Sequence, residues 1–381
     1  MKAPAHPDVI VLGAGLFGMH AALHFARQGR RVLLVERERR RDAWAKASLV
    51  NQARIHSGHH YPRSLRTAIM SLENRARFLH ENAQAINGSF TAYYGIDRYG
   101  SMTDARQFAR FCCKVGIQLR EVERPNLFAR TRLEALFETD EVSFDPFLLR
   151  NAYMAAIDES SAETLFGAWP VKAEPSGDVW VLDIEDTDGH RRTFHAGAVV
   201  NATYANINSV NVVFGVPTIA ATHEISEVVL LYCPALSGAG LTVMDGPYLS
   251  IMPFGRSGLH SLTSVLYTHR AYSAAEVPRF PCQERRPDCT PDATAVCTRC
   301  PVKPATNARK MVQQLSQYLA APADICIHGS LNTVKTKLKS ASADDGRPTD
   351  IRIHRRRPFF ASIFSGKVNS VYEVERIEID D

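Results

Sequence analysis

The sequence predicts a two-domain α/β protein, α+β overall, in which a domain with a parallel sheet and crossover helices is joined to a second domain built mostly on an antiparallel sheet. The chain has 381 residues, of which 45% are hydrophobic, enough for a large core and about two domains. Residues 8–36 have the pattern strand, glycine turn, helix, strand, which is typical of a parallel sheet with crossover helices. Strand-like runs separated by turn residues then recur between residues 171 and 268, which favours antiparallel pairing there.

The overall charge and hydropathy exclude several classes of protein. The formal net charge is +5, which is too small to indicate nucleic acid as a partner. No run of about 18 apolar residues occurs, so we expect no transmembrane helix. The first residues lack the apolar core of a secretory signal, and we therefore expect a cytoplasmic protein whose cysteines are thiols or metal ligands.

The N-terminal segment carries the fingerprint of a dinucleotide-binding site. The strand 8–12 runs into a glycine-rich turn and an amphipathic helix, and a second strand ends at Glu36, 23 positions after the first glycine. The glycines permit a tight turn, close approach of a pyrophosphate and close packing of the helix, whose positive end faces the phosphates. Glu36 is placed to accept hydrogen bonds from ribose hydroxyls, which disfavours a 2′-phosphate. The cofactor contacts predicted here are Gly13, Gly15, Leu16, Phe17, Gly18, Glu36 and Arg37.

The stretch 44–62, WAKASLVNQARIHSGHHYP, follows the second strand directly and indicates which dinucleotide is bound. In this order it resembles the FAD-dependent oxidoreductases of the D-amino-acid oxidase superfamily, particularly the branch containing L-2-hydroxyglutarate dehydrogenase. The resemblance implies FAD as cofactor and a glutathione-reductase-like FAD-binding Rossmann domain. It places Ser48, Asn51 and Gln52 beside the pyrophosphate, and the Ile55–Gly58 stretch beside the flavin. His56 and His59 are the candidate catalytic histidines, although each could equally be a hydrogen-bonding loop residue.

Further site residues follow from the same resemblance. A strand near residue 171 and a small-residue turn after the strand 198–200 match segments that contact FAD in the family. The stretch 364–370, FSGKVNS, resembles the last flavin-binding turn and the helix that follows it, and Asp344–Thr349 resembles an Asp-Xaa-Arg-Pro segment. The implied cofactor contacts are Val171, Asn201, Ala202, Thr203, Gly366, Lys367, Val368 and Asn369. Arg347 is a candidate for substrate carboxylate or flavin contact, with a stabilising ion pair as the alternative, and Lys367 is also a catalytic candidate.

The expected FAD-binding domain is discontinuous and comprises residues 1–90, 145–215 and 345–381. The substrate domain comprises 91–144 and 216–344, with an insertion at 278–304. Residues 238–241 repeat the letters GAGL, but Val243 occupies the position of the third glycine and no apolar strand precedes the turn. We therefore expect no second dinucleotide domain, which leaves the substrate as electron donor.

The insertion contains four cysteines with the spacing C-x6-C-x7-C-x2-C among many prolines. Prolines forbid a regular helix or central strand there, and a structural Zn²⁺ held by four thiolates would order the segment. Free thiols, disulfides or an iron–sulfur cluster are the alternatives. The candidate ligands are Cys282, Cys289, Cys297 and Cys300.

Together these features predict an enzyme, an FAD-dependent oxidase or dehydrogenase. It would oxidise a C–N or C–OH bond of a small amino- or hydroxy-acid-like substrate by hydride transfer to flavin N5, and oxygen or another acceptor would reoxidise the flavin. Two alternatives remain open, a non-redox flavoenzyme of the sugar mutase type and a binding or scaffold protein that retains FAD.

Overall fold

A six-stranded sheet brings together distant parts of the chain. The computed structural model describes residues 6–123, 126–342 and 348–380. The strand order is β20-β21-β13-β1-β2-β9, in which β20 is antiparallel to β21 and the other neighbours are parallel. Its strands are β1 (Val9–Leu12), β2 (Val32–Glu36), β9 (Glu163–Phe166), β13 (Ala198–Asn201), β20 (Asp350–Arg356) and β21 (Phe359–Phe364). The predicted α/β fold class is confirmed.

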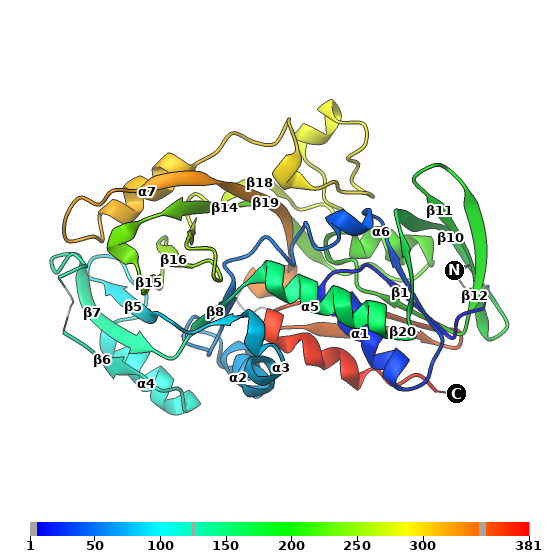
Figure 1. Ribbon diagram of the computed structural model, residues 1–381, viewed down its shortest axis with the longest axis horizontal. Helices are drawn as coiled ribbons and strands as arrows, with labels where there is room; N and C mark the ends of the chain where they lie inside the picture. Colours follow the sequence, from blue (N-terminus) through cyan, green and yellow to red (C-terminus); the bar gives the residue numbers. More distant parts are fainter. Residues whose placement is uncertain (1–5, 124–125, 343–347, 381) are drawn as a thin grey trace.

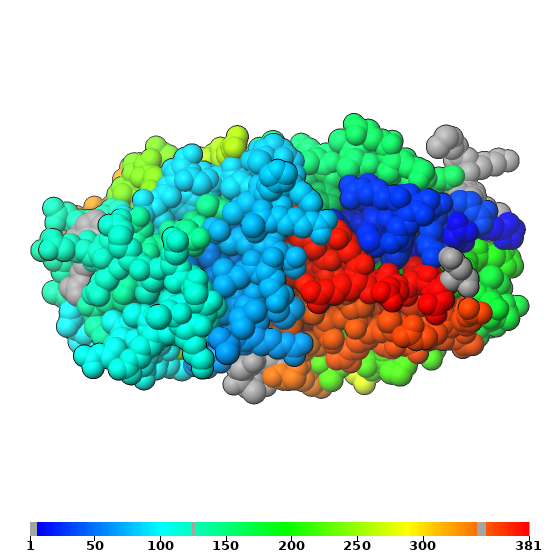
Figure 2. Space-filling model, turned by 90° about the horizontal axis from the view of Figure 1, so that it is seen from below, coloured from blue at the N-terminus to red at the C-terminus, as the bar shows by residue number. Residues whose placement is uncertain are grey.

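The central strand β1 is buried on both faces, as its unbroken apolar sequence VIVL requires. Val9 and Val11 face a core shared with α1, α5 and the C-terminal 3₁₀ helix η8, whereas Ile10 and Leu12 pack toward Trp180 of a three-stranded meander. Figure 2 shows η8 in red alongside α1 in dark blue on the surface. The layer on one face of the six-stranded sheet consists of α1 (Leu16–Arg27), α5 (Pro146–Glu159) and η8 (Val368–Arg376). The layer on the other face consists of the meander β10 (Ala168–Ser176), β11 (Val179–Asp186) and β12 (Arg191–Ala196) together with α6 (Ile207–Val213).

A nine-stranded sheet forms the other half of the molecule, with β5, β7 and β15 at the end of Figure 1 opposite the meander. The order is β18-β14-β17-β16-β15-β5-β7-β6, and β19 pairs with the long strand β14. Neighbours are antiparallel except β15 and β5, so the expectation of a mostly antiparallel sheet is confirmed. The strands are β5 (Thr91–Asp97), β6 (Arg120–Glu121), β7 (Leu133–Thr139), β14 (Ala221–Tyr232), β15 (Ala239–Met244), β16 (Leu249–Pro253), β17 (His260–Ser264), β18 (His269–Ser273) and β19 (Cys326–Leu338), and helices α4 (Ala105–Val115) and α7 (Ala308–Ser316) pack on this sheet.

A small third sheet lies between the two large ones and places the functional side chains. Its order is β3-β8-β4, with both pairs antiparallel. Its middle strand, β8, follows β7 of the nine-stranded sheet, and its first strand, β3, belongs to the stretch 44–62, which contains His56, His59 and His60. The elements are β3 (Arg54–Ile55), β4 (Ile86–Asn87) and β8 (Val142–Phe144), with α2 (Leu65–Glu73) and α3 (Arg75–Glu81) between β3 and β4.

Two helical segments are irregular. Apolar residues recur at helical spacing over 64–87, but α2 and α3 are separate, with Asn74 between them, and the segment ends in β4. The helix expected after Gly366 is the 3₁₀ helix η8, whose buried residues fill the core beside α1. The GAGL repeat leads into β15 (Ala239–Met244), as expected for a segment that is not a second dinucleotide turn.

The sheets suggest the same domain boundaries as the sequence. The six-stranded sheet takes its strands from residues 9–36, 163–166, 198–201 and 350–364, and the nine-stranded sheet takes its strands from 91–139 and 221–338. We therefore retain the discontinuous FAD-binding domain as our proposal. Within the three described ranges, no helix is both long and apolar enough to cross a membrane.

Gly18 permits α1 to lie against the glycine turn, and its substitution tests this packing. A Cβ atom at Gly18 would lie 1.7 Å from the carbonyl oxygen of Gly13, which is backbone and cannot move aside. We expect Gly18→Ala to lower the free energy of unfolding, measured by urea denaturation, by about 3 kcal/mol. Gly329→Ala is the control, because a Cβ there meets nothing within 4 Å, and its effect should stay below about 0.5 kcal/mol. Equal effects of the two substitutions would contradict this account.

Candidate active site

The glycine turn leaves bare backbone at the N-terminus of α1. Gly13 has a φ of +96°, which only glycine adopts readily, and a Cβ atom there would lie 2.9 Å from the carbonyl oxygen of Ala202. A Cβ on Gly15 would meet Ser48 Oγ at 2.9 Å, and Ser48 Oγ accepts a hydrogen bond from the Leu16 amide at 3.1 Å. Side chains are thus absent where the positive end of the helix faces open space, which fits the pyrophosphate of a dinucleotide.

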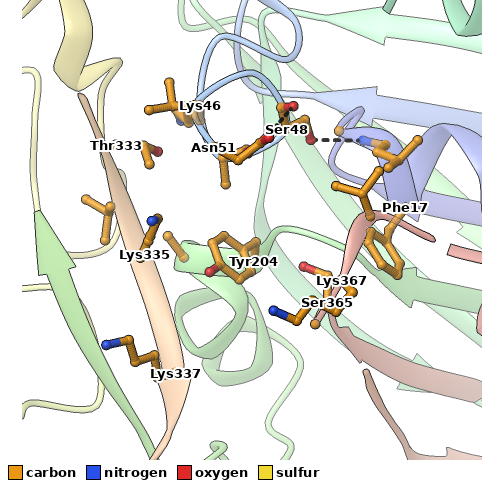
Figure 3. A pocket seen from close by; sticks show the side chains of 18 of the residues that line it. Phe17, Lys46, Ser48, Asn51, Tyr204, Thr333, Lys335, Lys337, Ser365 and Lys367 are labelled. Atoms are coloured by element: carbon orange, nitrogen blue, oxygen red, sulfur yellow. Dashed lines mark hydrogen bonds between the residues drawn. The ribbon is translucent and has the colours of Figure 1, made fainter. Parts of the chain in front are cut away.

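This turn opens into a cavity of 1210 Å³ between the two large sheets. Figure 3 shows Ser48 and Asn51 on one side, Lys335 and Lys337 of β19 on another, and Lys367 near Phe17. The predicted site residues that line it are Gly13, Gly15, Leu16, Phe17, Glu36, Arg37, Ser48, Asn51, Gln52, His56, Val171, Ala202, Thr203, Gly366, Lys367 and Val368. The structure therefore brings together residues from four separated segments of the chain.

Two of the predicted residues support the site from outside the cavity. Asn201 is fully buried, and its side-chain amide donates to the Ile207 carbonyl and to Asn211 Oδ1, each at 2.9 Å. Its Oδ1 accepts from Thr203 Oγ1 at 2.7 Å, so Asn201 positions the turn after β13. Asn369 is also buried and donates to the Ser71 carbonyl, which ties the C-terminal turn to α2. Both residues thus position turns beside the cavity, as Gly18 does through the packing of α1, and the contact of all three with the cofactor stays a prediction.

His59 does not line the cavity, and its place beside the flavin stays a prediction. Its ring lies 5.4 Å from that of Tyr94, and its Nε2 donates to the Gln118 carbonyl at 2.9 Å. His60 lines the cavity instead, together with His56 and Tyr61. His59 and His60 are adjacent, so the sequence pattern alone did not decide which of them lines the cavity. The candidate Arg347 lies outside the described residues.

Glu36 lies at the end of β2, at one end of the cavity. Its Oε2 accepts a hydrogen bond from the Ala14 amide at 2.6 Å, and its Oε1 accepts from the Glu38 amide at 2.8 Å. These bonds fix the carboxylate toward the glycine turn, where a ribose would lie. The neighbouring Arg37 guanidinium lies 5.7 Å from the centre of the Trp169 ring, and burial lowers its pKa.

The other end of the cavity is built on a buried ion pair. Arg54 and Glu141 have fully buried side chains, with Nε of the arginine 3.5 Å from Oε2 of the glutamate. Tyr94 Oη donates to the same glutamate oxygen at 2.8 Å and accepts from Arg54 Nη1 at 3.1 Å. Arg54 Nη2 also donates to Thr242 Oγ1 at 2.6 Å and to Ser250 Oγ. One guanidinium thereby joins β3 to strands β5, β15 and β16.

Burial and the neighbouring positive charges set the protonation of the cavity-facing groups. Burial alone would raise the pKa of Glu141, but Arg54 and His56 hold it well below the usual range, so that the carboxylate is ionised. Burial, with the charges of Lys367 and Arg54, lowers the pKa of His56 to about 3, and burial also keeps His60 neutral by lowering its pKa. Burial and the charge of Arg54 lower the pKa of Lys367 to about 7. This end of the cavity thus holds neutral imidazoles beside an amine that titrates near neutrality.

Sequence reasoning did not identify Glu141 or Tyr94. Glu141 lies between β7 and β8, in a run of charged and polar residues that is typical of an exposed turn. Its partner Arg54 is 87 positions away, so no local pattern reports the pair. The lysines of β19 were missed for the same reason, because only the pairing of β19 with β14 turns Lys335 and Lys337 toward the cavity.

The four clustered cysteines surround a second, separate cavity of 20 Å³. All eight cysteines of the chain, each in a described segment, are free thiols. In the part of the chain that the structure describes, one group of three side chains has its possible metal-ligating atoms within 4.8 Å of one another. This group is Asp186, Asp188 and His190. The cysteines thus share a cavity without forming a closed ligand set, and zinc binding remains a proposal.

The fold and the cavity define a dinucleotide-binding protein with a polar pocket facing the cofactor site. The family model described as FAD dependent oxidoreductase, DAO, matches residues 8–262, and the chain belongs to this family. It is an FAD-dependent oxidoreductase. Among curated proteins, no match was found.

Solved structures share the fold at low sequence identity. Glycine oxidase from Geobacillus kaustophilus is 14% identical with a TM-score of 0.70, covering 98% of this chain and 93% of that chain. NikD, described as an unusual amino acid oxidase essential for nikkomycin biosynthesis, is 15% identical with a TM-score of 0.71 and the same coverage. L-α-glycerophosphate oxidase from Mycoplasma pneumoniae, with FAD bound, is 13% identical with a TM-score of 0.71, covering 99% and 94%.

The buried pair predicts an asymmetric response to substitution. Glu141→Gln leaves the Arg54 charge uncompensated in the interior, and we expect the free energy of unfolding to fall by about 3–5 kcal/mol, measured by urea denaturation. Glu138→Gln, at the exposed pair with Arg120, is the control and should cost less than about 1 kcal/mol. The double variant Arg54→Met with Glu141→Leu should be more stable than the single variant. If the double variant is the less stable of the two, the charge argument is wrong.

Proposed function

We propose that this FAD-dependent oxidoreductase oxidises a C–N or C–OH bond of a small amino- or hydroxy-acid-like anion. When bound, FAD supplies the two-electron acceptor for the substrate hydride. The observation that carries the proposal is Lys367, a cavity-facing amine with a pKa of about 7 beside the buried charge of Arg54. Oxidation of an alcohol or an ammonium group requires loss of a proton, and the chain must provide the base.

Lys367 is better suited than His56 to take that proton. General bases work best when their pKa lies near the working pH, and about half of the Lys367 amines are neutral at pH 7. His56, with a pKa of about 3, is neutral but too weak a base, so it orients a substrate by hydrogen bonding. Lys367 Nζ lies 4.2 Å from the centre of the Tyr61 ring, which holds the amine at this end of the cavity.

The positive charges at this end favour an anionic substrate. Arg54 and Lys367 both line the cavity, and the charge of Arg54 is one cause of the lowered Lys367 pKa. A substrate carboxylate near them would relieve this repulsion, as expected from electrostatic complementarity. Binding of the carboxylate would in turn raise the Lys367 pKa, so that an acid and its decarboxylated analogue should differ in their pH dependence.

The finer assignment within the family is also a proposal. The Ile55–Gly58 stretch supports the branch containing L-2-hydroxyglutarate dehydrogenase, with His56 facing the cavity. The names of the solved structures mention both amino acid and glycerophosphate oxidases, so amines and alcohols both belong in the search. Oxygen or another electron acceptor would complete the cycle.

Anaerobic reduction of the flavin tests the proposed substrate class. The FAD-loaded protein is mixed with a panel of amino and hydroxy acids, and the flavin absorbance at about 450 nm is followed. We expect at least one acid to bleach this band, whereas matched amines and alcohols without the carboxylate bleach it much more slowly. A normal FAD content with no bleaching by any acid would count against the proposal. Activity that appears only after chemical reduction of the flavin would instead support the sugar mutase alternative.

The pH dependence of flavin reduction tests the base. With the acid that bleaches the flavin, we follow the second-order rate constant for flavin reduction at limiting acid, which reports the substrate-free protein. We expect this rate constant to rise about tenfold per pH unit below about pH 7 and to level off above it, because the deprotonated amine is the active form. Lys367→Met should lower the plateau by about 10²- to 10⁴-fold and remove this pH dependence. Lys114→Met, at an exposed position of α4, is the control and should leave the profile unchanged. A Lys367→Met profile that keeps its rise near pH 7 would contradict the assignment.

A further inference from the structure

The cysteine-rich segment 281–304 forms part of the wall of the cofactor cavity. It lies between β18 and α7, at the top of Figure 1 in yellow, and contains the short 3₁₀ helices η5 (Pro281–Arg285) and η6 (Cys297–Arg299). Asp292, Ala293, Thr294 and Ala295 line the large cavity, and Thr294 and Ala295 also line the small cavity between the cysteines. Thr294, Ala295 and Val334 of β19 therefore separate the four thiols from the cofactor site.

Hydrogen bonds attach this segment to the Glu36 end of the cavity. The Thr294 carbonyl accepts from Arg37 Nη1 at 3.1 Å and from Lys46 Nζ at 2.7 Å. Thr294 Oγ1 donates to Asn206 Oδ1 at 2.8 Å, on the turn that follows β13. Thr294 is thus linked through its backbone carbonyl to Arg37 and Lys46 and through its side chain to Asn206, on two sides of the expected ribose site.

An ion pair adds a second attachment, away from Thr294. Arg299 Nη1 lies 2.7 Å from Asp42 Oδ1, in the segment that follows β2. Arg299 lies between Cys297 and Cys300, so the ordering of the cysteines and the anchoring of the segment depend on the same few residues. Prolines dominate this segment, and little regular structure stabilises it.

Four possible sulfur ligands line the small cavity, and since no three of them lie within 4.8 Å of one another, metal binding requires them to move together. The cavity volume of 20 Å³ is enough for one ion or one water molecule, and Cys282, Cys289, Cys297 and Cys300 all line it. The Ala295 amide donates to Cys289 Sγ at 3.3 Å, a contact that stabilises a thiolate. The amide of Cys300 bonds to the Cys297 carbonyl at 3.0 Å, which forms the tight turn of a CxxC knuckle. Arg286 and Lys303 line the same cavity and would offset the negative charge of four thiolates around a divalent cation.

We propose that these four cysteines bind one structural Zn²⁺ ion. This ion holds Thr294 and the neighbouring residues that line the cofactor cavity in place, and thereby retains FAD. Binding releases four protons as the thiols become thiolates, which close in on the metal at about 2.3 Å. Four sulfur ligands leave no position for water, so the ion is structural and not catalytic. The metal stabilises the cysteine-rich segment, and this segment closes the Glu36 end of the cofactor cavity.

Metal analysis of the purified full-length chain tests the first half of this proposal. We expect about one zinc per chain, and its loss in the variant Cys297→Ser with Cys300→Ser. The exposed pair Cys113→Ser with Cys326→Ser is the control and should retain the metal. Absence of metal from the unmutated protein, or iron in place of zinc, would overturn the assignment of the site.

The affinity for FAD tests the second half. Zinc is removed from the unmutated protein by a chelator, FAD is titrated by the quenching of its fluorescence, and zinc or magnesium is then added back. We expect Kd for FAD to rise at least tenfold on zinc removal and to recover with zinc but not with magnesium, while circular dichroism shows that the sheets stay folded. A Kd that is unchanged by zinc removal would overturn the link between metal and cofactor.

A substitution outside the cysteines separates this link from local unfolding. Arg299→Gln removes the ion pair with Asp42 but keeps all four sulfurs. We expect it to retain zinc and to weaken FAD binding about threefold, whereas Arg309→Gln on the exposed face of α7 should do neither. Retained zinc with unchanged FAD affinity in Arg299→Gln would show that the segment does not act on the cofactor through this anchor and would contradict the proposed coupling.

Discussion

The buried contact between Arg54 and Glu141 is the interaction on which the active-site region depends. It joins the small sheet to the nine-stranded sheet, because the guanidinium bonds to side chains of β5, β15 and β16 while the glutamate follows β7. A buried charge is tolerated only when it is paired and hydrogen-bonded, so each group requires the other in place. Burial is the main cause of the lowered pKa of both His56 and Lys367, and the charge of Arg54 lowers both pKa values further. Arg54 therefore contributes both to the packing of the site and to the protonation of its side chains.

The cavity has two ends with different characters. At the glycine turn, backbone amides, a helix terminus and Glu36 provide a site that matches the phosphates and ribose of a dinucleotide. At the far end, polar side chains from both large sheets surround Arg54 and Lys367. Because the far end combines residues of both large sheets and of the small sheet, the packing between the sheets determines the geometry of that end relative to the glycine turn.

The sequence predicted well what depends on local pattern. The glycine turn with Glu36 at the end of the second strand, and the Ser48 to Gln52 stretch, all line the cavity, because short spacing constrains their geometry. Spacing alone does not decide which of the adjacent His59 and His60 lines the cavity. Asn201 and Asn369 lie beside the site, but their amides bond to backbone. Glu141 could not be predicted, since its role arises from a contact across 87 positions that only the folded chain creates.

The parallel pairing of β13 with β21 determines when the six-stranded sheet can be completed during synthesis. Residue 359 is aligned with residue 198, which in turn is aligned with residue 9, so one sheet contains residues synthesised about 350 positions apart. A ribosome releases the chain from its N-terminus, and strands that pair over such separations form slowly. The turn that carries Lys367 follows β21 and is synthesised about 350 positions after the glycine turn. A nascent chain therefore contains the glycine turn long before it has the residue that would complete the chemistry.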